Sequence, residues 1–87
     1  MEEKKLEKLL QEIEEYAQYN IEVKKTLENC LQKCEVPSAK IHYEKEINFL
    51  IGRIIGLYMV AMTLRKMLNL EIPKDGNYQV CFEGVLK

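Results

Sequence analysis

Residues 6–34 read LEKLLQEIEEYAQYNIEVKKTLENCLQKC, and this stretch decides the fold. Its apolar residues recur at alternating spacings of three and four, the heptad rhythm of a helix that packs against other helices. No Gly or Pro interrupts it, so we predict one helix over residues 2–34, with a break near Asn20 as the alternative. The series, apolar at every position except Asn20, is Leu6, Leu9, Ile13, Tyr16, Asn20, Val23, Leu27, Cys30 and Cys34, widened by Leu10, Ala17 and Leu31.

A second helix is predicted over residues 39–70, after a turn at residues 35–38. Pro37 disfavours helix at Val36, and Ser38 is a suitable N-cap because its hydroxyl accepts a bond from a first-turn amide. One face repeats the heptad rhythm through Ile47, Leu50, Ile54, Leu57, Ala61, Leu64 and Leu68. The opposite face is apolar as well, with Phe49, Ile51, Ile55, Met59, Val60, Met62 and Met67. A helix that is apolar on two faces is expected to be covered on both.

The C-terminal part, residues 73–87, is predicted to hold a turn and a short extended segment. Turn-forming residues fill positions 73–77. Residues 78–82 then alternate like a strand, with Tyr78, Val80 and Phe82 on one face. The fold class is therefore all-α: one domain over residues 1–87, built as a long antiparallel helical hairpin with a short C-terminal extended segment.

This hairpin is expected to assemble into a helical-bundle oligomer, a dimer or higher. Two helices have one interface between them, so the second apolar face of residues 39–70 would remain in water. Gly52 and Gly56, four residues apart, cost helix stability but permit close approach of another helix. We predict an oligomer interface formed by Gly52, Ile55, Gly56, Met59, Tyr78, Val80 and Phe82.

Composition argues against several functions. The 87 residues carry 13 basic and 14 acidic side chains, a net charge of −1 without a basic stripe, so we expect no nucleic-acid partner. The three cysteines, Cys30, Cys34 and Cys81, form an odd set in a chain whose N-terminus is charged from its second residue. This combination predicts reduced thiols and a cytoplasmic location.

Catalysis and metal binding are not expected. Ser38 and His42 share a helix face, but an N-cap and a surface histidine account for them, and no Gly-rich loop supplies an oxyanion or phosphate site. Cys30, Cys34 and His42 lie near the turn, yet Cys-x₃-Cys within a helix is not a usual zinc spacing. We therefore predict no enzyme activity, no metal and no cofactor.

Membrane association is a minor alternative for the second helix. Between Ile47 and Leu64 only Arg53 is charged, but a spanning helix needs about 20 apolar residues and a central Arg costs about 2.5 kcal/mol or more. A buried oligomer core explains the segment better, and we expect no membrane partner.

A polar and aromatic cluster is predicted halfway along the hairpin. Antiparallel pairing brings Asn20 near Gly52 and Arg53, with Tyr16 and Tyr19 close by. The structural interpretation is that Asn20 fixes the helix register and that Arg53 pairs with Glu15 or Glu22. The functional interpretation is a pocket for an anionic or planar ligand, formed by Tyr16, Tyr19, Asn20, Arg53 and Tyr58.

Two functions follow as hypotheses. The first is a non-enzymatic protein-interaction module: a small homo-oligomeric regulator, adaptor or inhibitor, whose C-terminal strand pairs with its own copy or with a protein partner's sheet. The second is an oligomer that sequesters a small anionic or nucleotide-like ligand near Arg53 and Tyr58. The sequence leaves the identity of the partner open.

Overall fold

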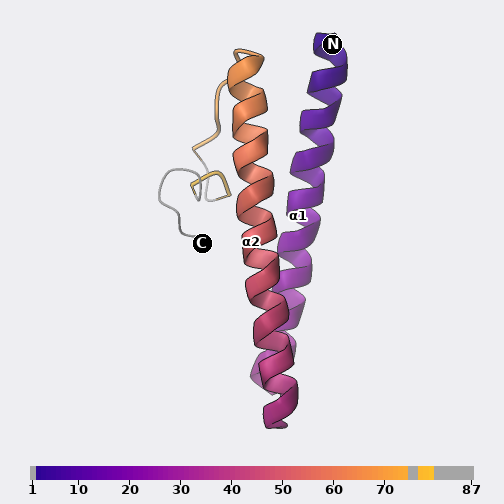
Figure 1. The fold of residues 1–87 in the computed structure, drawn as a ribbon, viewed down its shortest axis with the longest axis vertical. Coiled ribbons are helices and arrows are strands. Elements are labelled where there is room, and N and C mark those ends of the chain that lie inside the picture. Colours follow the sequence, from indigo (N-terminus) through magenta and orange to yellow (C-terminus); the bar gives the residue numbers. More distant parts are fainter. Residues whose placement is uncertain (1, 75–76, 80–87) are drawn as a thin grey trace.

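The structure is a hairpin of two long antiparallel helices. The computed structural model describes residues 2–74 and 77–79, in which α1 spans Glu3–Lys33 and α2 spans Pro37–Met67 (Figure 1). The molecule measures 51 × 24 × 15 Å with a radius of gyration of 15.3 Å, whereas a compact domain of this length would have about 12 Å. The predicted all-α hairpin is confirmed.

The turn between the helices is shorter than predicted and begins earlier. Cys34, Glu35 and Val36 connect the helices, and Val36, not Ser38, occupies the N-cap of α2. No side chain caps this end; Pro37 stands in the first turn instead. Proline suits the first helical position because it lacks the N–H that would need a partner and its φ is already helical. The predicted Ser38 cap is therefore wrong.

The end of α2 is set by an asparagine. α2 ends at Met67, three residues before the predicted end, and Asn69 adopts a left-handed φ of 58°. The Leu70 amide donates to the Arg65 carbonyl at 2.8 Å and the Asn69 amide donates to the Lys66 carbonyl at 3.2 Å. These two bonds form a Schellman motif, which satisfies carbonyls at the helix end and turns the chain back.

The core follows the predicted stripe on α2 and a rotated stripe on α1. On α2 the buried side chains include Ile47, Leu50, Ile54, Ala61 and Leu64, as the heptad pattern predicts. On α1 they are Leu10, Ala17, Asn20 and Ile21. Leu9 and Tyr16, which the pattern placed in the seam, are 41% and 46% exposed. With one facing helix, α1 buries a single narrow stripe, and the seam residues one position away lie at its edge.

The described part of the C-terminal segment runs back from the end of α2 towards the middle of the hairpin (Figure 1). Residues 77–79 form a turn, so the predicted strand does not begin at Tyr78. Val80 and Phe82, the other two members of that predicted strand face, lie outside the described residues. Tyr78 is 2% exposed and joins the core, together with the partly buried Leu68 and Ile72.

Candidate functional site

The two long sides of the hairpin differ, and side chains two residues apart on α1 mark them. Glu14 and Tyr16 leave the helix about 200° apart, since each residue turns the helix by about 100°. Glu14 contacts the C-terminal segment, whereas Tyr16 contacts Arg53 on the other side. We call the described residues after α2, 68–74 and 77–79, the tail. The tail-covered face holds Glu14, Arg65 and Tyr78, and the open face holds Tyr16, Phe49 and Arg53.

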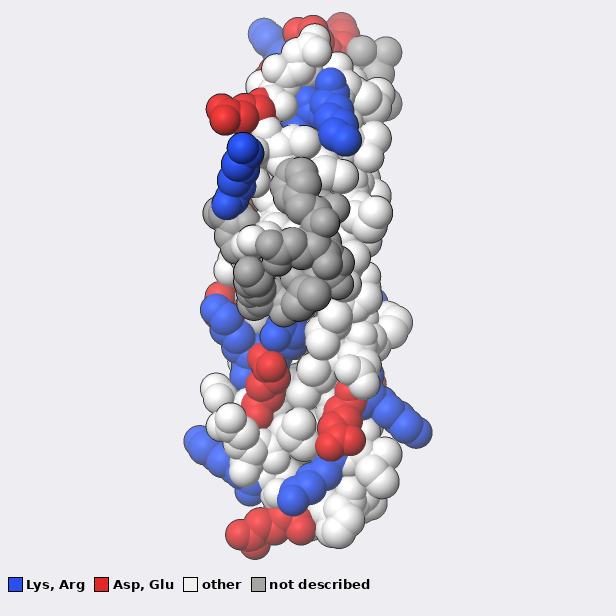
Figure 2. Space-filling view, turned by 90° about the vertical axis from the view of Figure 1, so that its left-hand side faces the viewer, with Lys and Arg blue, Asp and Glu red and all other residues white. Residues whose placement is uncertain are grey.

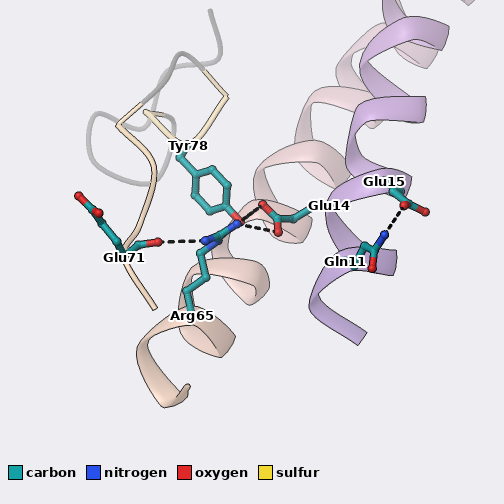
Figure 3. A network of polar contacts seen from close by, with 6 residues as sticks. All are labelled: Gln11, Glu14, Glu15, Arg65, Glu71 and Tyr78. Atoms are coloured by element: carbon teal, nitrogen blue, oxygen red, sulfur yellow. Dashed lines mark hydrogen bonds and ion pairs between the residues drawn. The ribbon is translucent and has the colours of Figure 1, made fainter. Parts of the chain in front are cut away.

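Arg65 is the centre of the tail-covered face (Figure 3). Its Nη2 donates to both oxygens of Glu14 at 2.9 Å, its Nε donates to the Tyr78 hydroxyl at 3.2 Å, and its Nη1 donates to the Glu71 carbonyl at 2.9 Å. The Tyr78 hydroxyl in turn donates to Glu14 Oε2 at 2.8 Å. One guanidinium thus joins α1, α2 and two points of the tail, and charge-assisted bonds of this kind are the strong ones.

The Tyr78 ring also packs against neighbouring side chains. It meets the buried Tyr58 edge to face, with ring centroids 4.9 Å apart, and Arg65 lies 5.5 Å from its centroid. Burial raises the pKa of the Tyr78 hydroxyl, and the bond to Glu14 raises it further, while Arg65 opposes the shift. Burial lowers the pKa of Arg65, but its bonds to Tyr78 and Glu14 outweigh this, so the pKa is raised. Both groups therefore keep their ordinary protonation at neutral pH.

The open face is organised around Arg53. Its Nη1 donates to the Tyr16 hydroxyl at 3.2 Å, and its guanidinium stacks over the Phe49 ring at 4.6 Å. Tyr16 stacks in turn on Tyr19, with centroids 6.4 Å apart. Phe49 is 60% exposed and Tyr19 63% exposed. In contrast to Tyr78, these aromatic rings are covered by little else in the described chain.

The predicted cluster at the middle of the hairpin forms in part. Tyr16, Tyr19 and Arg53 come together, and the buried Asn20 donates to the Tyr16 carbonyl at 2.7 Å. The ion pair predicted for Arg53 is not found among the described residues, where Glu15 accepts from Gln11 and Glu22 accepts from Gln18. Tyr58 lies on the tail-covered face against Tyr78, so the ligand pocket predicted from Arg53 and Tyr58 together is divided between two faces.

The residues predicted to form the oligomer interface differ in their exposure. Gly52, Gly56 and Met59 are exposed on the outer side of α2, and a Cβ placed on either glycine would meet no described residue within 4 Å. Ile55 is half-buried against the core. Tyr78 is enclosed by its own chain because Arg65 and Glu14 hold its hydroxyl, so in this conformation it is not available to a partner.

The residues considered for catalysis or metal binding lie near the turn between the helices. Ser38 and His42 are exposed. Cys30 and Cys34 are free and half-buried, and the Cys34 thiol donates to the Val36 carbonyl at 3.5 Å. Among residues 2–74 and 77–79, no group of three or more His, Cys, Asp or Glu side chains could hold a metal ion; Cys81 is not among them.

α2 is long and apolar enough to cross a membrane, judged by length and composition alone. A core helix of a soluble protein can meet the same criterion. Viewed from the side that carries the C-terminal segment, charges of both signs lie towards both ends of the surface, and the middle of the right-hand edge is uncharged (Figure 2).

Comparison with known protein families, with curated proteins and with solved structures finds no match. Sequence reasoning missed the contacts among Glu14, Arg65 and Tyr78. The one available signal was a tyrosine following a turn, which was assigned to a strand face instead. Nothing in the local pattern gives the direction in which the chain leaves α2.

Proposed function

We propose that the protein is a non-enzymatic interaction module that works as a homo-oligomer, in the manner of a small regulator, adaptor or inhibitor. The observation that carries this proposal is the contrast between the faces. The chain covers one face with its own tail, while the other presents exposed apolar side chains from both helices: Leu9, Tyr16, Tyr19, Phe49, Val60 and Met67.

The extent of this surface supports a second copy as its occupant. From their exposed fractions, these six side chains present roughly 600 Å² of mostly apolar surface, near the ~800 Å² that each partner buries in an interface of standard size. Patches of this extent on small proteins mark interaction sites. A two-fold interface uses the same patch on both copies, and apolar patches with few charges suit such self-pairing.

The alternative, sequestration of a small anionic ligand between Arg53 and Tyr58, has less support. Tyr58 is 3% exposed and packs on the tail-covered face. Arg53 lies on the open face, so it shares no site with Tyr58.

Light scattering after size exclusion, in reducing buffer with a chelator, tests the proposal. We expect a dimer or larger species, and we expect Phe49→Glu on the open face to convert it to a monomer. Leu70→Glu is the matched control, since it adds the same charge at an exposed apolar residue of the C-terminal segment. A monomeric wild-type chain, or equal effects of the two variants, would contradict the proposal.

A further inference from the structure

Two charged side chains border the open face on α2, and neither has an ion-pair partner among the described residues. Arg53 is exposed, and its described polar contact is the neutral Tyr16 hydroxyl. Glu46 is exposed as well, and the salt bridges of the described chain do not include it. A positive and a negative charge therefore flank an apolar surface, and no described residue forms an ion pair with either of them.

The spacing of these two charges has a geometric consequence. Glu46 and Arg53 are seven residues apart, so they project from nearly the same side of the helix, about 10.5 Å apart along its axis. Phe49 lies between them on the adjoining strip, 60% exposed, with Arg53 stacked on its ring. The order along α2 is thus acid, exposed ring, base.

Resting on the function proposed above, we propose that two copies pack through α2 in antiparallel orientation, about a two-fold axis that crosses the helix between Phe49 and Leu50. This axis sets Glu46 opposite Arg53 of the partner subunit, and Arg53 opposite Glu46 of the partner subunit. The two Phe49 rings meet next to the axis. Each symmetric pair neutralises charges that the described residues of the single chain leave unpaired.

The charges also discriminate against the other orientation. In parallel packing about an axis along the helices, Glu46 would face its own copy and Arg53 would face its own copy. Like charges placed opposite each other at an interface are repulsive and suppress wrong arrangements. Contact between Arg53 and Tyr16 and Phe49 of its own chain holds the guanidinium in place before association, which reduces the side-chain entropy lost on pairing.

Charge reversal tests the arrangement, with the dissociation constant of the dimer measured by sedimentation velocity over a dilution series. Glu46→Arg and Arg53→Glu each set like charges against each other twice in the dimer, and we expect each to raise the dissociation constant on the order of 10- to 100-fold. The double variant restores opposite charges in reversed order, and we expect it to return to within about threefold of the wild type.

Glu44→Arg is the matched control. It makes the same charge change two residues away, where the side chain leaves the helix on a different side, and we expect little effect on the dissociation constant. Circular dichroism establishes that every variant keeps its helices. A dimer that the single reversals leave unchanged, or that the double reversal fails to restore, would overturn this arrangement while the self-association stands. A wild-type chain that stays monomeric would remove the proposed function together with it.

Discussion

The two faces of this hairpin contain similar residues, which are buried on one face and exposed on the other. On the tail-covered face an arginine, a tyrosine and a carboxylate close on one another, and the tyrosine is 2% exposed. On the open face an arginine, two tyrosines and a phenylalanine also touch, but the rings are 46–63% exposed. What the open face lacks, among the described residues, is a carboxylate paired with its arginine.

This difference separates the contacts that stabilise the fold from the side chains that remain available for association. A charge that is partly buried must be paired, and Arg65 has its carboxylate within the chain. An exposed charge has no such requirement, so Arg53 can remain without an acid until another molecule supplies one. We therefore expect substitutions on the tail-covered face to change folding stability and substitutions on the open face to change association.

The largest effect is expected from Tyr78→Ala. The substitution removes a buried ring from its contact with Tyr58 and releases the tail, and we expect a loss of about 3 kcal/mol in the free energy of unfolding. Urea denaturation followed by circular dichroism measures it. Tyr19→Ala on the open face is the control, with an expected loss below about 0.5 kcal/mol. Equal losses would mean that the tail does not hold the fold together.

The next largest loss of stability is expected at Arg65, with Arg53 as its comparison. Arg65→Met leaves Glu14 without its ion pair and frees the Glu71 carbonyl, and we expect a loss of about 2 kcal/mol. Arg53→Met gives up one exposed hydrogen bond and one stacking contact, for which we expect about 0.5 kcal/mol. Thermal unfolding at low protein concentration ranks the two, and the reverse order would refute the assignment of the faces.

A smaller effect is expected from the Tyr78 hydroxyl alone. Tyr78→Phe keeps the ring contact and removes the hydroxyl, at a cost of about 1 kcal/mol at neutral pH. The pKa of Tyr78 is raised on folding above its usual value of 10.0. The stability that this shift contributes is present below pH 10 and is lost as the pH rises through the folded pKa. The wild type should therefore lose its advantage over Tyr78→Phe above pH 10; a constant difference up to pH 11.5 would be inconsistent with a buried hydroxyl.

The smallest expected change is a gain in folding stability. Gly56→Ala adds a Cβ that meets no described residue within 4 Å, and alanine exceeds glycine in helix stability by up to about 1 kcal/mol. We expect the free energy of unfolding to rise, measured at the lowest workable protein concentration. A fall would show that Gly56 is already in close contact within the chain.

The two helices could be predicted from the sequence, whereas the contacts that hold the C-terminal segment against them could not. Heptad spacing predicted both helices and the α2 core, because burial on a helix follows a period that can be counted. The turn was misplaced because Pro37 can begin a helix as readily as it can interrupt one. The Glu14–Arg65–Tyr78 contacts could not be predicted, because they depend on the direction that Asn69 gives to the tail, and a single left-handed residue leaves no periodic signal.

The central claim is that the chain itself covers one face, while a second copy covers the other. Hydroxyl-radical footprinting of the wild-type chain across a dilution series tests it most directly, because it reads the exposure of individual side chains. We predict that Tyr58 and Tyr78 stay protected at every concentration, while Phe49 and Tyr16 are protected at high concentration and become reactive on dilution. Open-face side chains whose reactivity is independent of concentration, or a Tyr78 as reactive as Tyr19 in the dilute sample, would contradict the account.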